Sequence, residues 1–232
     1  MGEFIEESKK AFDRITKDIG TAIGLSLIMT ATLAVIGIGA FLLVKSQNAA
    51  GFTAMAIGTI IGVYLGGYNI ENFHNLLKSK GLPKVTKNVL NKFKWGILAF
   101  VIALVYASPV VIADLALIAA NVQEVFVSIT SNIIAIIIMF PAAAALIEYS
   151  RRNKFKDAFK WEVIKKAYRA KFVGFYLGGI LIGYLIMVGI AITIVGAFII
   201  LALGPLYMQH MAVAGYVEKK HKRKVRRKRR KK

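Results

Sequence analysis

The sequence predicts an all-α polytopic membrane protein whose six transmembrane helices form three hairpins. Three observations predict this fold. Hydrophobic residues make up 57% of the 232 residues, well above the share in a soluble domain. The apolar runs are continuous and about 20 residues long, which is the length of a helix that crosses a bilayer. Of the 32 Lys and Arg residues, all but Lys45 fall in alternate gaps between these runs.

The charge distribution also predicts an orientation. Basic loops are retained on the cytoplasmic side of a membrane, so both termini are expected there, in the plasma membrane. The outer gaps carry only Lys45 and Glu124, with Asp114 near the same interface. Cysteine is absent, which excludes a disulfide framework or a thiolate metal site.

The predicted transmembrane domain covers residues 20–217. Its spans are residues 20–44, 49–69, 95–119, 125–148, 172–194 and 197–217. No polar loop divides the last two, but the combined stretch is too long for one helix to cross a bilayer, so a tight turn near Val195 and Gly196 is predicted. One long span with an interfacial continuation is the alternative, and it would place the basic tail on the outer side.

Helical segments that carry basic residues are expected between the hairpins on the cytoplasmic side. Residues 1–19 place Ile5, Phe12 and Ile15 on one stripe, which is typical of an amphipathic helix on a membrane surface. Residues 70–94 and 155–171 are also predicted to be largely helical. The resulting units, residues 1–70, 71–149 and 150–217, are similar in length, and either an internal repeat or chance similarity explains them.

Small residues recur at four-residue spacing in two predicted spans. The set is Ala54, Gly58, Gly62 and Gly66 in the second span, with Gly174 and Gly178, and Gly179 and Gly183, in the fifth. Such residues let a neighbouring helix approach closely. Packing within one chain and a seam between copies of a homo-oligomer both fit this pattern. Pro109, Pro141 and Pro205 lie within spans and are expected to kink them.

Few polar residues lie within the spans. Asp114, Asn132 and His210 are candidates for a polar site, with Ser128 and Ser131 one turn from Asn132. They line a cavity or make hydrogen bonds between helices. No Asp, Glu, Lys or Arg lies near the middle of any predicted span, which disfavours an ion-coupled carrier, and His210 is the one titratable group well inside a span. No catalytic, cofactor-binding or metal-binding motif is present, so the chain is expected not to be an enzyme.

Residues 218–232 form a polybasic tail that is predicted to be disordered. Its basic residues are Lys219, Lys220, Lys222, Arg223, Lys224, Arg226, Arg227, Lys228, Arg229, Arg230, Lys231 and Lys232. Directly after a membrane helix, such a tail is expected to contact anionic lipid headgroups. Contact with the phosphates of the ribosome or another RNA is the alternative.

Short motifs in three regions resemble those of a known family. The first runs from Gly66 to Pro83, the second from Phe140 to Trp161, and the third is Gly204-Pro205-Leu206-Tyr207 with Ala212, Ala214 and Gly215. In these regions the sequence is similar to archaeal and bacterial membrane proteins catalogued as domain of unknown function 4013. The resemblance covers roughly residues 55–217 and implies a multi-pass membrane fold without catalytic residues. The polybasic tail departs from the family pattern.

The sequence therefore favours a non-enzymatic membrane component that organises lipids or partner proteins at the cytoplasmic surface. The alternative is a transporter, channel or insertase, indicated by the prolines and glycines within the spans.

Overall fold

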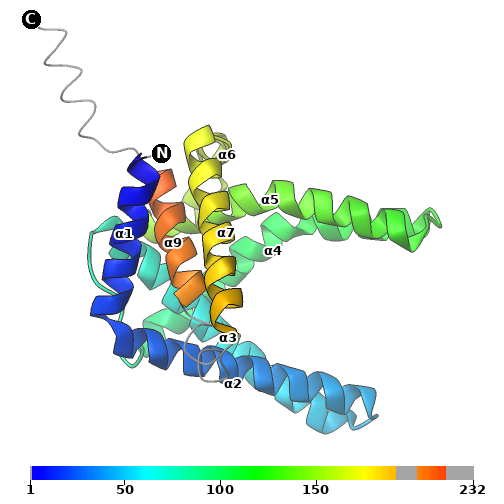
Figure 1. Cartoon of the computed structure of the whole chain (residues 1–232). Coiled ribbons are helices and arrows are strands. Elements are labelled where there is room, and N and C mark those ends of the chain that lie inside the picture. Colours follow the sequence, from blue (N-terminus) through cyan, green and yellow to red (C-terminus); the bar gives the residue numbers. More distant parts are fainter. Residues whose placement is uncertain (1, 192–202, 218–232) are drawn as a thin grey trace, which may run out of the picture.

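The computed structural model describes residues 2–191 and 203–217, and within these ranges all regular secondary structure is helical (Figure 1). The elements are α1 (Gly2–Lys17), α2 (Ile19–Val44), α3 (Asn48–Leu77), α4 (Val89–Ala119), α5 (Glu124–Arg152), the 3₁₀ helix η1 (Phe155–Phe159), α6 (Trp161–Ala167), α7 (Ala170–Ala191) and α9 (Leu203–Tyr216). The all-α prediction is confirmed, and the amphipathic segment predicted at residues 1–19 overlaps α1.

Four helices, α2 to α5, are long and apolar enough to cross a membrane. In their most apolar 18-residue windows only 11–17% of residues are buried within the chain. Apolar surface left exposed on this scale fits a lipid environment, where it need not be shielded from water. The chain is therefore a multi-pass membrane protein, and its first four predicted spans correspond to these helices.

The prediction of six spans is wrong for the described residues, where four helices meet the length and hydropathy requirement. The fifth predicted span overlaps α7, whose apolar part at residues 170–185 is shorter than the other four helices. The sixth overlaps α9, and the predicted turn near Val195 lies outside the described residues. Figure 1 shows α7 and α9 running across the direction of the hairpins α2–α3 and α4–α5 rather than alongside them.

Three long helices end in the same backbone motif. Ser46, Ser79 and Asn121 follow α2, α3 and α4 with φ near +60°. In each case the next amide donates to a carbonyl five residues earlier, as Gln47 does to Leu42. This arrangement is a Schellman motif, which caps carbonyls at a helix end. After α2 and α4 the motif reverses the chain within a few residues and so produces the two long hairpins. After α3 it leads into the segment 78–88.

The hairpins meet where α3 crosses α4. A Cβ atom added at Gly67 would lie 1.6 Å from the Lys92 carbonyl oxygen, and one at Gly96 would lie 1.8 Å from that of Val63. Only glycine permits two helix backbones to approach this closely. The contact joins the hairpins at their bases.

The core lies at these bases, in a region called here the basal body: α1, the connector 78–88, η1, α6, α9, and the adjoining ends of α2, α3, α4, α5 and α7. One buried cluster contains Ile102, Ile147 and Phe172, and a second contains Leu25, Tyr207 and Met211. The basal body therefore holds the hairpins in place, while the distal parts of α2 to α5 remain largely exposed.

Candidate functional site

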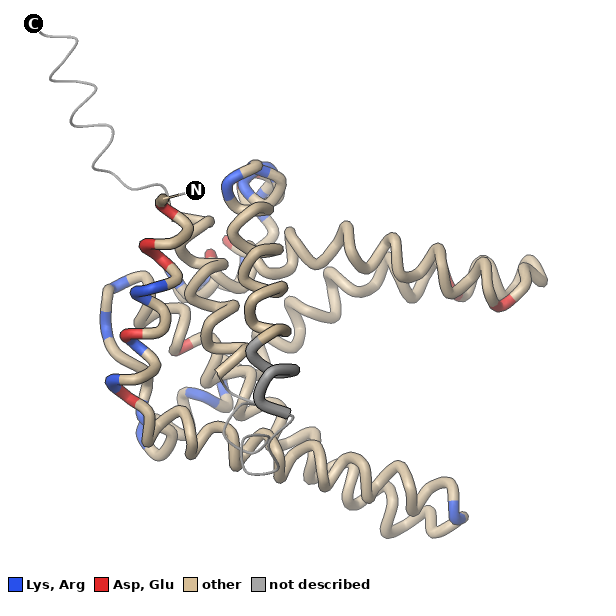
Figure 2. The backbone as a smooth tube through the Cα atoms, in the orientation of Figure 1, with Lys and Arg blue, Asp and Glu red and all other residues tan. Residues whose placement is uncertain are grey.

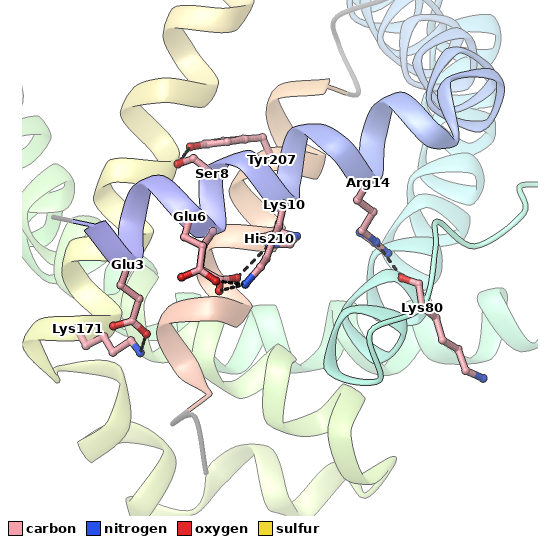
Figure 3. A network of polar contacts seen from close by, with 10 residues as sticks. Glu3, Glu6, Ser8, Lys10, Arg14, Lys80, Lys171, Tyr207 and His210 are labelled. Atoms are coloured by element: carbon pink, nitrogen blue, oxygen red, sulfur yellow. Dashed lines mark hydrogen bonds and ion pairs between the residues drawn. The ribbon is translucent and has the colours of Figure 1, made fainter. Parts of the chain in front are cut away.

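A cavity of about 620 Å³ lies in the basal body between α1, the end of α3 and α9. Its polar lining comes from Glu7, Lys10, Asp13, Arg14, Lys17, Asp18, Ser79, Lys80 and His210, and its apolar lining comes from Leu76, Leu77, Val213, Ala214 and Val217, with Gly81 completing the wall. α1 contributes most of the charged residues because its turns place residues 7, 10, 14 and 17 on one side of the helix. Figure 3 shows α1 lying against α9, with polar side chains between them.

Arg14 is fixed in the wall of this cavity by neutral acceptors. Its Nε donates to the carbonyl of Lys80 at 3.0 Å, and its Nη2 donates to the carbonyl of Gly81 at 3.0 Å and to Asn72 Oδ1 at 2.7 Å. Burial lowers the pKa of the guanidinium to about 10, which still leaves it charged at neutral pH. Among residues 2–191 and 203–217, no carboxylate lies within 4.0 Å of Arg14, and Nη1 makes no hydrogen bond.

A chain of side-chain amides extends from Arg14 into the protein. Asn72, which is fully buried on α3, donates from Nδ2 to Gln209 Oε1 at 2.5 Å. Gln209 on α9 in turn donates to Asn69 Oδ1 at 2.8 Å. Buried polar groups are tolerated when they are hydrogen-bonded, and a connected series of them specifies one packing arrangement. These bonds join α1, α3 and α9 around the cavity.

His210, one of the predicted polar residues, faces α1 in the same cavity. Its Nε2 lies 3.5 Å from Glu7 Oε2. Glu7 also pairs with Lys10 at 3.1 Å, and Lys10 reaches Glu6 at 2.6 Å. Hydrogen bonds from the ammonium to these two carboxylates raise the pKa of Lys10. The Nδ1 atom of His210 is buried and has no hydrogen-bond partner within the described chain.

Asp13 and Asp18 contribute the remaining carboxylates. Asp18 accepts a hydrogen bond from the amide of Leu82 at 2.9 Å, which ties the connector to the end of α1. A Cβ atom at Gly81 would lie 2.7 Å from Asp18 Oδ2, so the absence of a side chain there allows the approach. In the described part of the chain, no Lys or Arg nitrogen lies within 4.0 Å of either aspartate.

Asp114 and Asn132, the other two predicted polar residues, lie apart from His210. Both line a cavity of about 680 Å³ near the turn between α4 and α5. Ser131 donates to the carboxylate of Asp114, and Asn132 Nδ2 donates to the carbonyl of Ser128 at 2.8 Å. The structure thus brings Asp114 and Asn132 together and places His210 in the basal body.

Lys92 is a buried charged residue that no sequence pattern identified as special. It is fully buried at the start of α4, with Nζ 3.0 Å from Glu71 Oε2. The ammonium also donates to the carbonyls of Lys84, at 2.9 Å, and Lys87. Two hydrogen bonds to carbonyls and one ion pair therefore compensate the buried ammonium, which is the condition under which it is tolerated. These contacts fix the connector against α3.

A second group of charges surrounds two buried carboxylates at the end of α5. Glu148 lies 2.9 Å from Arg152 and accepts a hydrogen bond from the Tyr216 hydroxyl at 2.6 Å. Asp157 on η1 pairs with Lys160 at 2.5 Å and with Arg152 at 3.6 Å. The hydrogen bond from Lys160 is the main cause of a lowered pKa at Asp157. This group joins α5, η1 and α9.

The predicted small residues have different surroundings. A Cβ atom at Gly58 would lie 2.5 Å from Ile36 of α2, and Ala54 lies near Gly39. Gly66 lies near Gly96, whereas a Cβ at Gly62 would meet no atom within 4 Å. In α7, Gly178 faces Phe4, and Gly179 and Gly183 face Met211 and Met208 of α9. Gly174 has open space beside it. The close α3–α4 contact uses Gly67, outside the predicted stripe.

Within residues 2–191 and 203–217 there is no cluster of three His, Cys, Asp or Glu residues that could hold a metal ion. The phosphate-contacting residues predicted in the tail, residues 219–232, lie outside the described ranges, as does any arrangement of the tail itself.

Comparison with known proteins gives one result. A family model described as "Protein of unknown function (DUF4013)" matches residues 50–204, from the start of α3 to the start of α9. The match includes the first two regions in which the sequence resembles that family and ends at Gly204, where the third begins. No curated protein and no solved structure gives a match.

Proposed function

Since the chain belongs to the family described as Protein of unknown function (DUF4013), whose description assigns no activity, we propose from the structure that it is a non-enzymatic membrane component that recruits anionic lipids at its cytoplasmic face. In this proposal the basal body lies at the cytoplasmic surface and both termini are on that side.

The segregation of charge along the molecule carries this proposal. Figure 2 shows the Lys and Arg residues gathered around the basal body, whereas the far ends of the hairpins are nearly bare of them. Lys45 is the basic residue at the end of α2, and the α4–α5 turn contributes Glu124. A basic surface beside a membrane attracts anionic headgroups with about 1 kcal/mol per charge. The polybasic tail at residues 218–232 directly follows α9 in the sequence and carries twelve Lys and Arg residues.

The test is the lipid composition around the protein. Full-length protein is extracted from native membrane in polymer-bounded discs, and its lipids are compared with those of bulk membrane. Enrichment of anionic lipids is expected, with a smaller enrichment around residues 1–217 alone. A lipid shell identical to bulk membrane contradicts the proposal. Recovery of ribosomes with the full chain, but not with residues 1–217, would instead support RNA as the partner of the tail.

A transporter, channel or insertase is the second candidate. The cavity that contains Asp114, Ser131 and Asn132 favours it, because polar groups between membrane helices can line a path for a polar solute. Ion flux through proteoliposomes that is abolished by Asp114→Asn, but not by Glu124→Gln, would support this candidate. Flux that is the same with and without the protein would remove it.

A further inference from the structure

We infer that the cavity between α1, the segment 78–81 and α9 binds one phospholipid whose headgroup carries both a phosphate and an ammonium group. The inference goes beyond the proposed function, because it names one defined lipid site that selects a headgroup with both charges, on a face that is otherwise proposed to attract anionic lipids by its overall charge. Three features of the cavity lead to it: a guanidinium with no carboxylate within 4.0 Å, two carboxylates with no Lys or Arg nitrogen within 4.0 Å, and an adjoining apolar wall.

Arg14 is suited to hold the phosphate. Its Nε and Nη2 are fixed by the carbonyls of Lys80 and Gly81 and by Asn72, so the guanidinium cannot turn away from the cavity. None of these acceptors is charged, and Nη1 keeps its two donors without a partner among the described residues. Asp18 acts on the guanidinium only at longer range. A fixed guanidinium with no carboxylate within 4.0 Å binds phosphate oxygens with little loss of side-chain entropy. Lys17 and Lys80 line the same cavity and add positive charge.

Asp13 and Asp18 are suited to hold the ammonium group. Both line the cavity, and neither has a Lys or Arg nitrogen within 4.0 Å in the described part of the chain. Asp18 uses one oxygen to accept the Leu82 amide, which leaves its other oxygen available. Because no direct ion pair joins Arg14 to these two aspartates, a ligand with both charges can contact all three. A simple anion would satisfy only Arg14.

The apolar wall favours a lipid over a soluble zwitterion or free phosphate. Leu76 and Leu77 lie at the end of α3, one of the four helices able to cross the membrane, and Val213 and Val217 come from α9. Acyl chains leaving the headgroup could therefore follow an apolar surface toward the bilayer. A volume of about 620 Å³ is within the usual range for a small-molecule site.

The polybasic tail is the competing occupant, because it begins directly after Val217 at the cavity wall. Its Lys and Arg side chains could pair with Asp13 and Asp18. They would take up the aspartates' charge and would bring further positive charge beside the Arg14 guanidinium. Charge complementarity therefore favours the phospholipid.

Native mass spectrometry of the full-length protein, titrated with phosphatidylethanolamine or phosphatidylglycerol, tests the inference. We expect one retained phosphatidylethanolamine per chain, bound about tenfold more tightly than phosphatidylglycerol, which has no ammonium group. Arg14→Gln should reduce retention of both lipids about tenfold. Asp13→Asn should reduce the preference between them while phosphatidylglycerol is still retained.

Lys80→Glu provides a variant that preserves the fold, because only the backbone carbonyl of Lys80 contacts Arg14. It should weaken retention about tenfold, whereas Lys78→Glu, two residues away and outside the cavity lining, should not. Equal retention by wild type and by both Arg14→Gln and Lys80→Glu would overturn the inference. So would displacement of the lipid by millimolar inorganic phosphate, or binding that occurs only after the tail is removed.

These outcomes are separable from those of the proposed function. If the site exists but the surface does not recruit anionic lipids, the single retained lipid remains and the surrounding shell matches bulk membrane. If the surface recruits lipids but the site does not exist, the shell is enriched and the Arg14 and Lys80 variants behave as wild type.

Discussion

The hydroxyl of Tyr168 donates a hydrogen bond of 2.9 Å to the carbonyl of Ile137. Ile137 lies four residues before Pro141 in α5, so its carbonyl has no helical amide to accept from. A hydroxyl also replaces the missing amide donor in α4. There the Ser108 hydroxyl donates at 2.8 Å to the carbonyl of Val105, four residues before Pro109. Polar backbone groups in a membrane must find partners within the protein, and these two hydroxyls supply them.

Tyr168→Phe should therefore lower stability, because it removes the donor and leaves the Ile137 carbonyl without a partner. The expected loss is about 1 kcal/mol, seen as a lower thermal unfolding midpoint in detergent. Tyr184→Phe is the matched control, since Tyr184 on α7 is 62% exposed and makes no hydrogen bond within the described chain. Equal midpoints for the two variants would show that Tyr168 does not stabilise the proline site.

Glycine substitutions test the junction of the two hairpins. Gly67→Ala and Gly96→Ala should each destabilise the protein by about 3 kcal/mol or more, because the new methyl group would overlap a carbonyl of the facing helix. Gly62→Ala, on the same helix as Gly67, meets no atom within 4 Å and should have little effect on the monomer. Unfolding midpoints in detergent would measure all three. A large loss for Gly62→Ala would instead indicate a partner on that face, such as a second copy of the chain.

The buried ammonium of Lys92 allows a third prediction. Lys92→Met keeps much of the side-chain volume but leaves the Glu71 carboxylate without its cation and two connector carbonyls without their donor. Removal of one partner of a buried ion pair is expected to lower the free energy of unfolding by about 3–5 kcal/mol. Limited proteolysis should also cut the connector 78–88 faster. Lys94→Met, which changes an exposed lysine two residues away, should alter neither measurement.

The sequence predicts α2 to α5 well because each is a long apolar run, and hydropathy is a property of single segments. It does not predict which glycine meets a partner: Gly62 and Gly67 are equally visible in the sequence, but only the crossing of α3 over α4 distinguishes them. Lys92 and Arg14 look like ordinary basic loop residues. Their burial depends on the connector 78–88, whose path is set by contacts with α1, α3 and α4 that no periodicity reveals.

The same limit applies to the polar candidates. Asp114 and Asn132 come together because a short turn brings α4 and α5 side by side, which a hairpin predicts directly. His210 faces Glu7 through the packing of α1 on α9, two segments at opposite ends of the chain. The prediction of six spans counted apolar residues correctly, but it assumed that α7 and α9 run alongside the other helices. Their crosswise arrangement depends on packing against α1 and the basal core.

Acid should destabilise the basal body through Asp157. The hydrogen bond from Lys160 holds the pKa of this carboxyl below its value in the unfolded chain, which is about 3.9. A depressed folded pKa means that the stabilisation is present above the unfolded value and is lost as the pH falls through the folded value. Lys160→Gln should therefore lower the unfolding midpoint at pH 7, and the difference from wild type should shrink below about pH 4. Asp157→Asn should remove this acid dependence, whereas a difference between Lys160→Gln and wild type that persists unchanged in acid would contradict the role of the pair.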